Sequence, residues 1–143
     1  MDVRLYQPAD KQACLTVFDS NVPDFFAVHE RGEFAVFLET LAAPYYVMEH
    51  DGAVAGCGGY TVTGHAARLT WGMIRRDLHR KGLGRFLLLF RLREMTRTDT
   101  AVETVGLETS QLSAPFFVSQ GFRIARPAGL DRVELTKRLT VCA

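Results

Sequence analysis

The sequence contains few of the residues that mark disulfide-bonded or metal-bound proteins. Its three cysteines, Cys14, Cys57 and Cys142, are odd in number and far apart, and no CxxC or Cys/His ligand spacing occurs. This pattern argues against a disulfide framework and against a structural zinc site, and it fits a reducing compartment. We therefore expect no disulfide and no bound metal.

Long hydrophobic runs are also missing. No stretch approaches the roughly 20 apolar residues that a membrane-spanning helix needs. The first residues, Met1 to Leu5, lack the basic and apolar segments of a secretion signal. A cytoplasmic location without a membrane partner is the expectation.

Charge of one sign is not in excess, because 17 Lys and Arg residues are balanced by 16 Asp and Glu residues, with a net charge of +1. Nucleic-acid-binding domains are usually more basic. The positive residues in the middle of the chain are nevertheless crowded: Arg68, Arg75, Arg76, Arg80, Lys81, Arg85, Arg91, Arg93 and Arg97. The crowding indicates an anionic ligand, with a nucleic-acid-binding basic domain as the weaker alternative.

The chain has 143 residues, of which 48% are hydrophobic, and this predicts a single globular domain over 1–143. The expected elements are a strand at 3–7, a helix to about 19, one or two helices across 25–41, strands at 45–49, 54–63 and 68–74, a helix at 83–96, a strand at 102–107, a short helix at 110–120, and strands at 122–125 and 132–139. In the strand at 68–74, alternation places Leu69, Trp71 and Met73 on one face. The order of elements indicates an α/β (α+β) fold, with a mixed sheet covered by helices.

The loop between the strand that ends at Ile74 and the helix that begins at Leu83 carries the most informative motif, His79-Arg80-Lys81-Gly82-Leu83-Gly84-Arg85. The first N–H groups of a helix lack internal partners and can donate to phosphate oxygens. Glycine at positions 82 and 84 removes Cβ atoms that would hold a diphosphate away from those amides. The nearby side chains that would add charge attraction are Arg76, Arg80, Lys81 and Arg85.

A glycine pair at a helix start is a weak signal when taken alone. It can simply open a helix while the arginines form a solvated face. The spacings of other phosphate loops are absent: there is no GxxxxGK[ST], and GxGxxG fails because residue 87 is leucine. Nucleoside-triphosphate and dinucleotide folds therefore lose support.

The stretch 79–84 resembles the Gln/Arg-x-x-Gly-x-Gly/Ala signature of the GCN5-related N-acetyltransferase (GNAT) superfamily. A second stretch, 114–122, is similar to the short helix with an aromatic pair and Gly-Phe that follows in this family. The two motifs occur in the family's order, and the resemblance spans nearly the whole chain. The sequence is identified as a bacterial-type, single-domain member. The resemblance implies a mixed sheet of about seven strands, splayed in the middle and flanked by about four helices.

The resemblance also implies acetyl-CoA as cosubstrate, bound between the strand that ends at Ile74 and the strand that begins near Val105, with no metal. Backbone groups would bind the pyrophosphate and the pantetheine arm, and Gln111 stands where many relatives have a coenzyme-contacting asparagine. The implied coenzyme-binding residues are Met73, Ile74, His79, Arg80, Lys81, Gly82, Leu83, Gly84, Arg85, Gln111 and Phe117.

Two positions depart from the family pattern. His79 replaces the usual Gln or Arg, a tolerable change where the main-chain amide is the ligand. Phe117 replaces the tyrosine that commonly serves as general acid, and it has no proton to give. An ordinary thiol has a pKa of about 8.5, so the thiolate can leave with help from water or from the hydroxyl of Ser110, Ser113 or Ser119. We therefore expect a working transferase, with a catalytically silent acyl-CoA-binding module as the alternative.

The catalytic residues are not assigned by the sequence, because the strand at 68–74 carries no carboxylate. Weak candidates for the general base are His29, Glu30, Glu33, His65 and Glu108, each of which is more often a solvated surface group. The resemblance implies direct attack by a primary amine in a ternary complex. The acceptor is expected to be a small-molecule amine or a peptide, with no nucleic-acid partner, and a homodimer is one option for the assembly.

Overall fold

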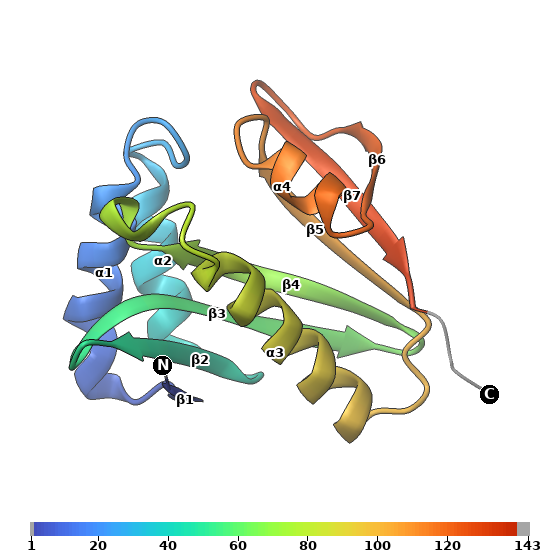
Figure 1. The fold of residues 1–143 in the computed structure, drawn as a ribbon, viewed down its shortest axis with the longest axis horizontal. Coiled ribbons are helices and arrows are strands. Elements are labelled where there is room, and N and C mark those ends of the chain that lie inside the picture. Colours follow the sequence, from blue (N-terminus) through green and yellow to red (C-terminus); the bar gives the residue numbers. More distant parts are fainter. Residues whose placement is uncertain (1, 140–143) are drawn as a thin grey trace.

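The computed structural model describes residues 2–139, which contribute to one mixed sheet of seven strands with helices on both faces (Figure 1). The strand order is β1-β2-β3-β4-β5-β7-β6. All neighbouring strands are antiparallel except β4 and β5, which are parallel. The predicted α/β fold, with about seven strands and about four helices, is confirmed.

The elements of the N-terminal half are β1 (Asp2–Leu5), the 3₁₀ turn η1 (Pro8–Asp10), α1 (Lys11–Ser20), α2 (Glu30–Glu39), β2 (Tyr45–His50), β3 (Ala53–Thr63) and β4 (Ala66–Ile74). Those of the C-terminal half are the 3₁₀ turn η2 (Arg76–Leu78), α3 (Leu83–Thr98), β5 (Thr104–Ser110), α4 (Ala114–Ser119), β6 (Arg123–Pro127) and β7 (Arg132–Arg138). Residues 21–29, expected to be partly helical, form turns instead, so that α2 begins only at Glu30. Within the described residues no helix is long and apolar enough to span a membrane.

Strand alternation divides the core between the two faces of the sheet. Tyr45 and Val47 of β2 pack with α1 and α2, whereas Tyr46 of the same strand packs with α3 and α4. On the first face, Phe18 and Phe34 are fully buried and stack at 5.7 Å. Each buried phenylalanine contributes roughly 1.5–3 kcal/mol to folding, so this aromatic layer holds the two N-terminal helices on the sheet.

The regular alternation fails in β4, and the prediction that Leu69, Trp71 and Met73 share a face is wrong. Leu69 belongs to the core under α3, whereas Trp71 and Met73 pack on the α1/α2 side. A β-bulge is the physical reason, because Gly58 of β3 opposes two residues of β4, Trp71 and Gly72. Trp71 has a left-handed φ of 40° at this point. The extra residue shifts the alternation by one position, so the side chains that follow it point to the opposite face from the one that regular alternation predicts.

The sheet is open between β4 and β5, as predicted. The two strands pair only over Ala66–Arg68 and Thr104–Gly106 and then diverge (Figure 1). β5 instead pairs with β7 along its whole length. The later part of β4, residues 69–74, therefore has no strand partner on its β5 side within residues 2–139. We call the space between the diverging strands the sheet opening.

Candidate functional site

The loop that joins β4 to α3 presents a run of unpartnered backbone amides. Within the described residues, no backbone or side-chain acceptor bonds the N–H groups of residues 80–85. Arg80 and Gly82 have left-handed φ values of 64° and 84°, and Gly82 is the N-cap of a 16-residue helix. Successive free amides at a helix N-terminus form a concavity that favours anions. We call residues 80–85 the amide loop.

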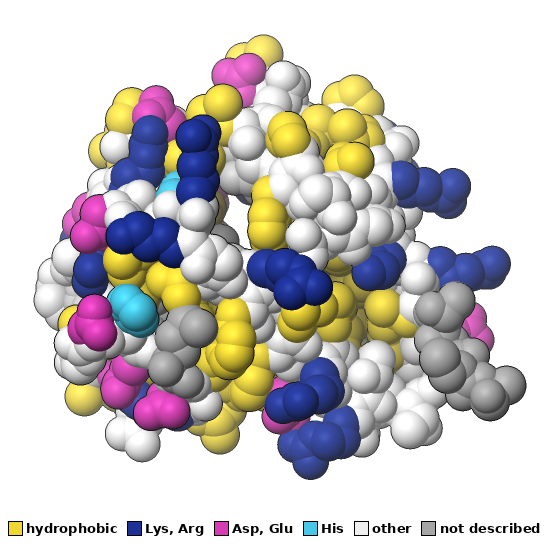
Figure 2. All heavy atoms as spheres, viewed as in Figure 1, with side chains coloured by type: hydrophobic (Ala, Val, Ile, Leu, Met, Phe, Trp, Pro, Cys, Tyr) yellow, Lys and Arg dark blue, Asp and Glu magenta, His cyan; other side chains and the backbone are white. Residues whose placement is uncertain are grey.

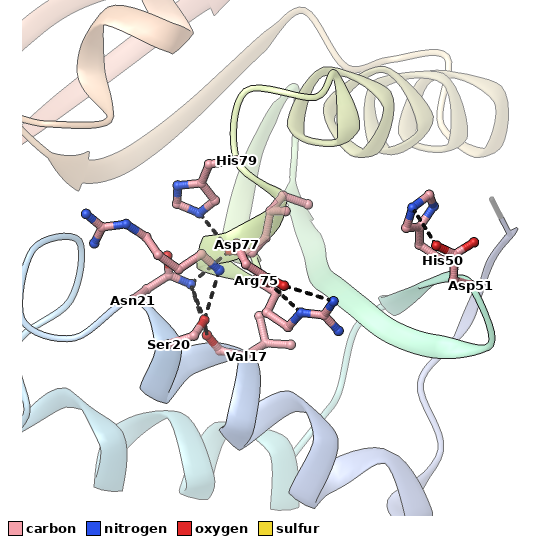
Figure 3. A network of polar contacts seen from close by, with 10 residues as sticks. Val17, Ser20, Asn21, His50, Asp51, Arg75, Asp77 and His79 are labelled. Atoms are coloured by element: carbon pink, nitrogen blue, oxygen red, sulfur yellow. Dashed lines mark hydrogen bonds and ion pairs between the residues drawn. The ribbon is translucent and has the colours of Figure 1, made fainter.

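His79 stands just before the amide loop and is turned away from it (Figure 3). Its Nε2 donates a hydrogen bond to the carbonyl oxygen of Ile74 at 2.8 Å, and Asn21 Nδ2 donates to the same oxygen at 2.9 Å. The backbone N–H of His79 donates to the carbonyl of Arg76 at 3.2 Å. The free amides thus begin at Arg80, and His79 anchors the loop to the end of β4.

The basic residues in the middle of the chain do not form one free surface. Four are paired with carboxylates: Arg68 with Glu134, Arg75 with Asp77, Arg76 with Asp24, and Arg97 with Glu94. Arg91 is buried. Those that make no ion pair with a described residue are Arg80, Lys81, Arg85 and Arg93. Figure 2 shows Lys and Arg side chains separated by hydrophobic ones on this face. Charge free to attract an anion is therefore concentrated at the amide loop.

Gly84 lies where three elements meet. A Cβ atom at this position would be 3.7 Å from Phe116 Cζ on α4 and 3.9 Å from Ile74 Cγ1 on β4. The start of α3 therefore contacts both the end of β4 and the aromatic pair of α4 across the sheet opening. Phe116 makes this contact, whereas the sequence motif singles out its neighbour Phe117. The aromatic pair alone does not tell which ring turns toward the helix.

Phe117 is half-buried between aromatic rings. It lies edge-on to Phe116 at 5.0 Å and to Phe122 at 5.7 Å. The serines named as alternative proton donors are already engaged. Ser110 Oγ accepts from the Ser113 N–H at 3.2 Å and lies 3.3 Å from the Ser113 hydroxyl oxygen, and Ser119 donates to the carbonyl of Phe116. These hydroxyls serve the local structure of α4.

Gln111 lies apart from the amide loop. It is exposed and lines a shallow groove between α4 and the strands β6 and β7, together with Pro115, Val118 and Ile124. A different groove, along the outer face of α3, begins at Gly82 and Arg85. The coenzyme contact assigned to Gln111 by resemblance stays a prediction.

The candidates for the general base are placed unequally. Arg132 of β7 bonds Glu108 of β5 at 2.9 Å and lies 3.9 Å from Glu30 of α2, so it bridges the two halves of the molecule. His29 and Glu33 are exposed and make no hydrogen bond or ion pair with a described residue. The side chain of His65 bonds the carbonyl of Ala101, next to the paired end of β4 and β5. Glu30 and Glu108 are thus brought together at Arg132, and the role of any of the five as general base stays a prediction.

Within residues 2–139 no group of three or more metal-ligating side chains is assembled. The candidate site consists of the amide loop, the edge of β4 and the ion pairs of Arg132 with Glu30 and Glu108. A mixed sheet that opens between two parallel strands, with an anion-binding loop at the start of the following helix, is the fold of the GCN5-related N-acetyltransferases.

The family model described as the acetyltransferase (GNAT) family matches residues 14–122. The chain belongs to this family. A search of curated proteins finds no match.

Solved structures agree on the fold. The chain is similar to the ribosomal-protein-S18-alanine N-acetyltransferase from Escherichia coli, at 18% identity and a TM-score of 0.77 over 99% of this chain and 96% of that one. It is similar to the PaiA N-acetyltransferase from Thermoplasma acidophilum in complex with coenzyme A, at 12% identity and a TM-score of 0.76 over 96% and 98% of the two chains. An aminoglycoside 6'-N-acetyltransferase complexed with coenzyme A is 12% identical, with a TM-score of 0.78 over 100% and 99%. Identities of this size show the fold, and the acceptor is a separate question.

Proposed function

We propose that this protein is an acetyl-CoA-dependent N-acetyltransferase that acts on a primary amine by direct attack in a ternary complex. The observation that carries the proposal is the amide loop, whose N–H groups have no partner within the described residues. Arg80, Lys81 and Arg85 belong to the same loop and make no ion pair with any residue in 2–139. A diphosphate is the ligand that satisfies both features at once.

The glycines leave room for such a ligand. Apart from its chain neighbours, no atom of the described part of the chain lies within 4 Å of a Cβ built at Gly82, so a phosphate can approach the backbone there. Gly82 has a left-handed φ, a conformation that residues with a Cβ adopt only with strain. This conformation directs successive amides toward the same side of the loop. In the proposed complex, the pyrophosphate of the coenzyme accepts hydrogen bonds from residues 80–85.

The pantetheine arm is proposed to lie along the free edge of β4. The N–H of Arg75 donates to the Ala55 carbonyl of β3 at 2.7 Å, so by alternation the backbone groups of Ile74 point away from β3. The carbonyl of Ile74 is already bonded by Asn21 and His79. Its N–H therefore becomes the group available to pair with an extended ligand, as an added strand would.

The proposed reaction begins with the acceptor amine attacking the acetyl carbonyl. An N–C bond forms, the negative charge passes to the carbonyl oxygen, and a backbone N–H near the β4 bulge stabilises it. The C–S bond then breaks and its electrons leave with the sulfur. The amine proton passes to water or to a carboxylate on the acceptor side, where Arg132 draws Glu30 and Glu108 together.

Phe117 favours one alternative, a catalytically silent acyl-CoA binder. General acid catalysis is worth about 10² to 10⁴-fold, which is a serious loss only where the leaving group is poor. A thiol with a pKa of about 8.5 leaves readily as thiolate near neutral pH. We therefore propose an active transferase in place of a silent binder. A nucleic-acid-binding role has less support, since much of the basic cluster is paired or buried.

The test is release of free coenzyme A from acetyl-CoA with a panel of small amines, amino acids and peptides, followed by mass measurement of each product. Acceptor-dependent thiol release and a product heavier by one acetyl group are expected. Binding of acetyl-CoA without turnover across the panel would support the silent binder. Stabilisation by oligonucleotides but not by acetyl-CoA would contradict both the transferase and the silent binder.

A further inference from the structure

Arg91 is a buried cation that the proposed chemistry has not used. It lies on α3 with only 3% of its surface exposed. Among the described residues its one hydrogen bond runs from Nη1 to the carbonyl of Gly59 at 3.3 Å, and its Nε has no partner there. No described carboxylate forms an ion pair with it. Buried charges are usually paired, so an unpaired one calls for an explanation.

Two glycines at the β-bulge make room for this side chain. A Cβ atom at Gly72 would lie 2.8 Å from Arg91 Nη2, and one at Gly58 would lie 3.0 Å from Arg91 Cζ. Any larger residue at Gly72 would collide with the guanidinium. Gly72 itself is exposed, so its peptide separates the buried charge from solvent at the bulge. The guanidinium therefore lies directly behind the bulge in β4.

The charge is present at neutral pH and is not cancelled nearby. Burial lowers the pKa of Arg91 to about 10, which still leaves the guanidinium protonated at pH 7. Tyr45 and Cys57, whose ionised forms would raise the pKa of Arg91, belong to the core on the α1/α2 face of the sheet, opposite to α3. Burial raises the pKa of Tyr45 well above its ordinary value, so that hydroxyl stays neutral. An uncompensated positive potential results at Gly72.

We propose that Arg91 is a positioning residue for catalysis, which stabilises the negative charge on the departing coenzyme A sulfur and so replaces the proton donor that Phe117 lacks. The inference rests on the proposed function, which places the thioester at the bulge. As the C–S bond breaks, its electron pair stays on sulfur as a thiolate. Arg91 gives up no proton and acts across the Gly72 peptide, and the attraction strengthens when the bound coenzyme excludes water from the bulge.

The first test titrates the thiol of coenzyme A bound to the wild-type protein, through the ultraviolet absorbance of the thiolate. Desulfo-coenzyme A, which lacks the sulfur, corrects for protein thiols and tyrosines. The bound thiol should show a pKa at least roughly one unit below that of free coenzyme A titrated under the same conditions. A bound thiol that titrates at or above that value overturns the role of Arg91. Absence of coenzyme A binding would instead contradict the proposed function.

The second test compares two variants. Arg91→Lys keeps the charge, whereas Arg91→Gln loses the charge and keeps a donor for the Gly59 carbonyl. We expect Arg91→Gln to raise the bound thiol pKa by about one unit and to lower kcat roughly tenfold, with the KM for acetyl-CoA within about twofold of wild type. Arg91→Lys should stay near wild type in both measurements.

A purely structural role predicts a different result. Both variants would then melt at lower temperature, and the bound thiol pKa would not change between them. That outcome contradicts the proposal. The wild-type titration needs no variant, so it tests the proposal even where one substitution prevents folding.

Discussion

The ring of His79 reaches back to the strand from which its loop departs, since its Nε2 lies 2.8 Å from the carbonyl oxygen of Ile74. Asn21 bonds the same oxygen from the end of α1 (Figure 3). The two bonds hold the end of β4 against the start of the amide loop. The histidine that departs from the family motif therefore has a structural role that requires neither metal binding nor proton transfer.

Removal of this anchor should loosen the loop. His79→Ala deletes one donor to a carbonyl that Asn21 still satisfies, a change worth about 1 kcal/mol, or roughly fivefold in affinity. We expect coenzyme A to bind that much more weakly in titration calorimetry. His79→Gln, which keeps a side-chain donor, should recover most of the loss. Equal affinity for wild type and His79→Ala would show that the loop holds its shape without this bond.

The missing tyrosine gives a second prediction. Phe117 is packed edge-on between Phe116 and Phe122, and the leaving thiolate is stable near neutral pH. Phe117→Tyr should therefore change kcat by less than about tenfold in a steady-state assay of thiol release. A gain of roughly a hundredfold or more would mean that protonation of the sulfur limits the wild-type reaction.

Two carboxylates on α2, Glu30 and Glu33, allow a controlled test of which one acts on the acceptor amine. Glu30 accepts a hydrogen bond from the Ala27 N–H and lies near Arg132, whereas Glu33 on the same helix is exposed and has no such partner among the described residues. Glu30→Gln should lower kcat/KM for the amine at least about fivefold while the affinity for coenzyme A is retained. Glu33→Gln should leave both quantities near wild type. Similar effects of the two substitutions would exclude a specific role for Glu30.

The contacts of Asp10 predict how the free energy of unfolding depends on pH. The hydrogen bonds from Arg4, at 2.8 and 2.9 Å, hold the pKa of this carboxyl below its ordinary value, with a further bond from the Gln7 N–H. Because the pKa of Asp10 is lower in the folded than in the unfolded state, its ionisation stabilises the folded protein at pH values above the unfolded-state pKa of about 3.9. This contribution is lost as the pH falls through the folded-state pKa.

The Asp10→Asn variant should accordingly be less stable by about 1–2 kcal/mol at pH 7. The difference from wild type should shrink steadily as the pH falls below about 4. Urea unfolding at several pH values measures both quantities. A difference that stays constant down to pH 2 would show that the ionised carboxylate contributes nothing specific.

Local features of the fold are predictable because their causes are local. The turn between β2 and β3 contains Asp51 and Gly52, a pair that favours tight turns, and both residues adopt left-handed φ values, 53° and 77°. The amide loop is predictable for the same reason, since Gly82 has a positive φ and a helix start leaves its amides free. The family motif then supplies the order and splay of the sheet.

Other features depend on residues distant in the sequence. Alternation gives no sign that Trp71 begins a bulge, because the bulge is a property of the pairing with Gly58. The arginine cluster looks uniform in the sequence, whereas tertiary contacts pair Arg68 with Glu134, 66 positions away, and bury Arg91 behind Gly72. The periodicity of apolar residues indicates which face of a helix packs on the sheet, but it does not indicate that a long charged side chain such as that of Arg91 is buried there.

The central claim is that residues 80–85 bind the diphosphate of an acyl-CoA. Its most direct test is titration calorimetry of acetyl-CoA with wild type, Gly84→Ala and Gly84→Glu. Alanine fits, because its Cβ would lie 3.7 Å from Phe116, whereas glutamate adds bulk and negative charge beside the amides.

Wild type should bind acetyl-CoA, and Gly84→Ala should bind within a few fold of it. Gly84→Glu should show no measurable binding while its circular dichroism spectrum remains that of the folded protein. Acetyl-CoA binding by Gly84→Glu with wild-type affinity would contradict the account.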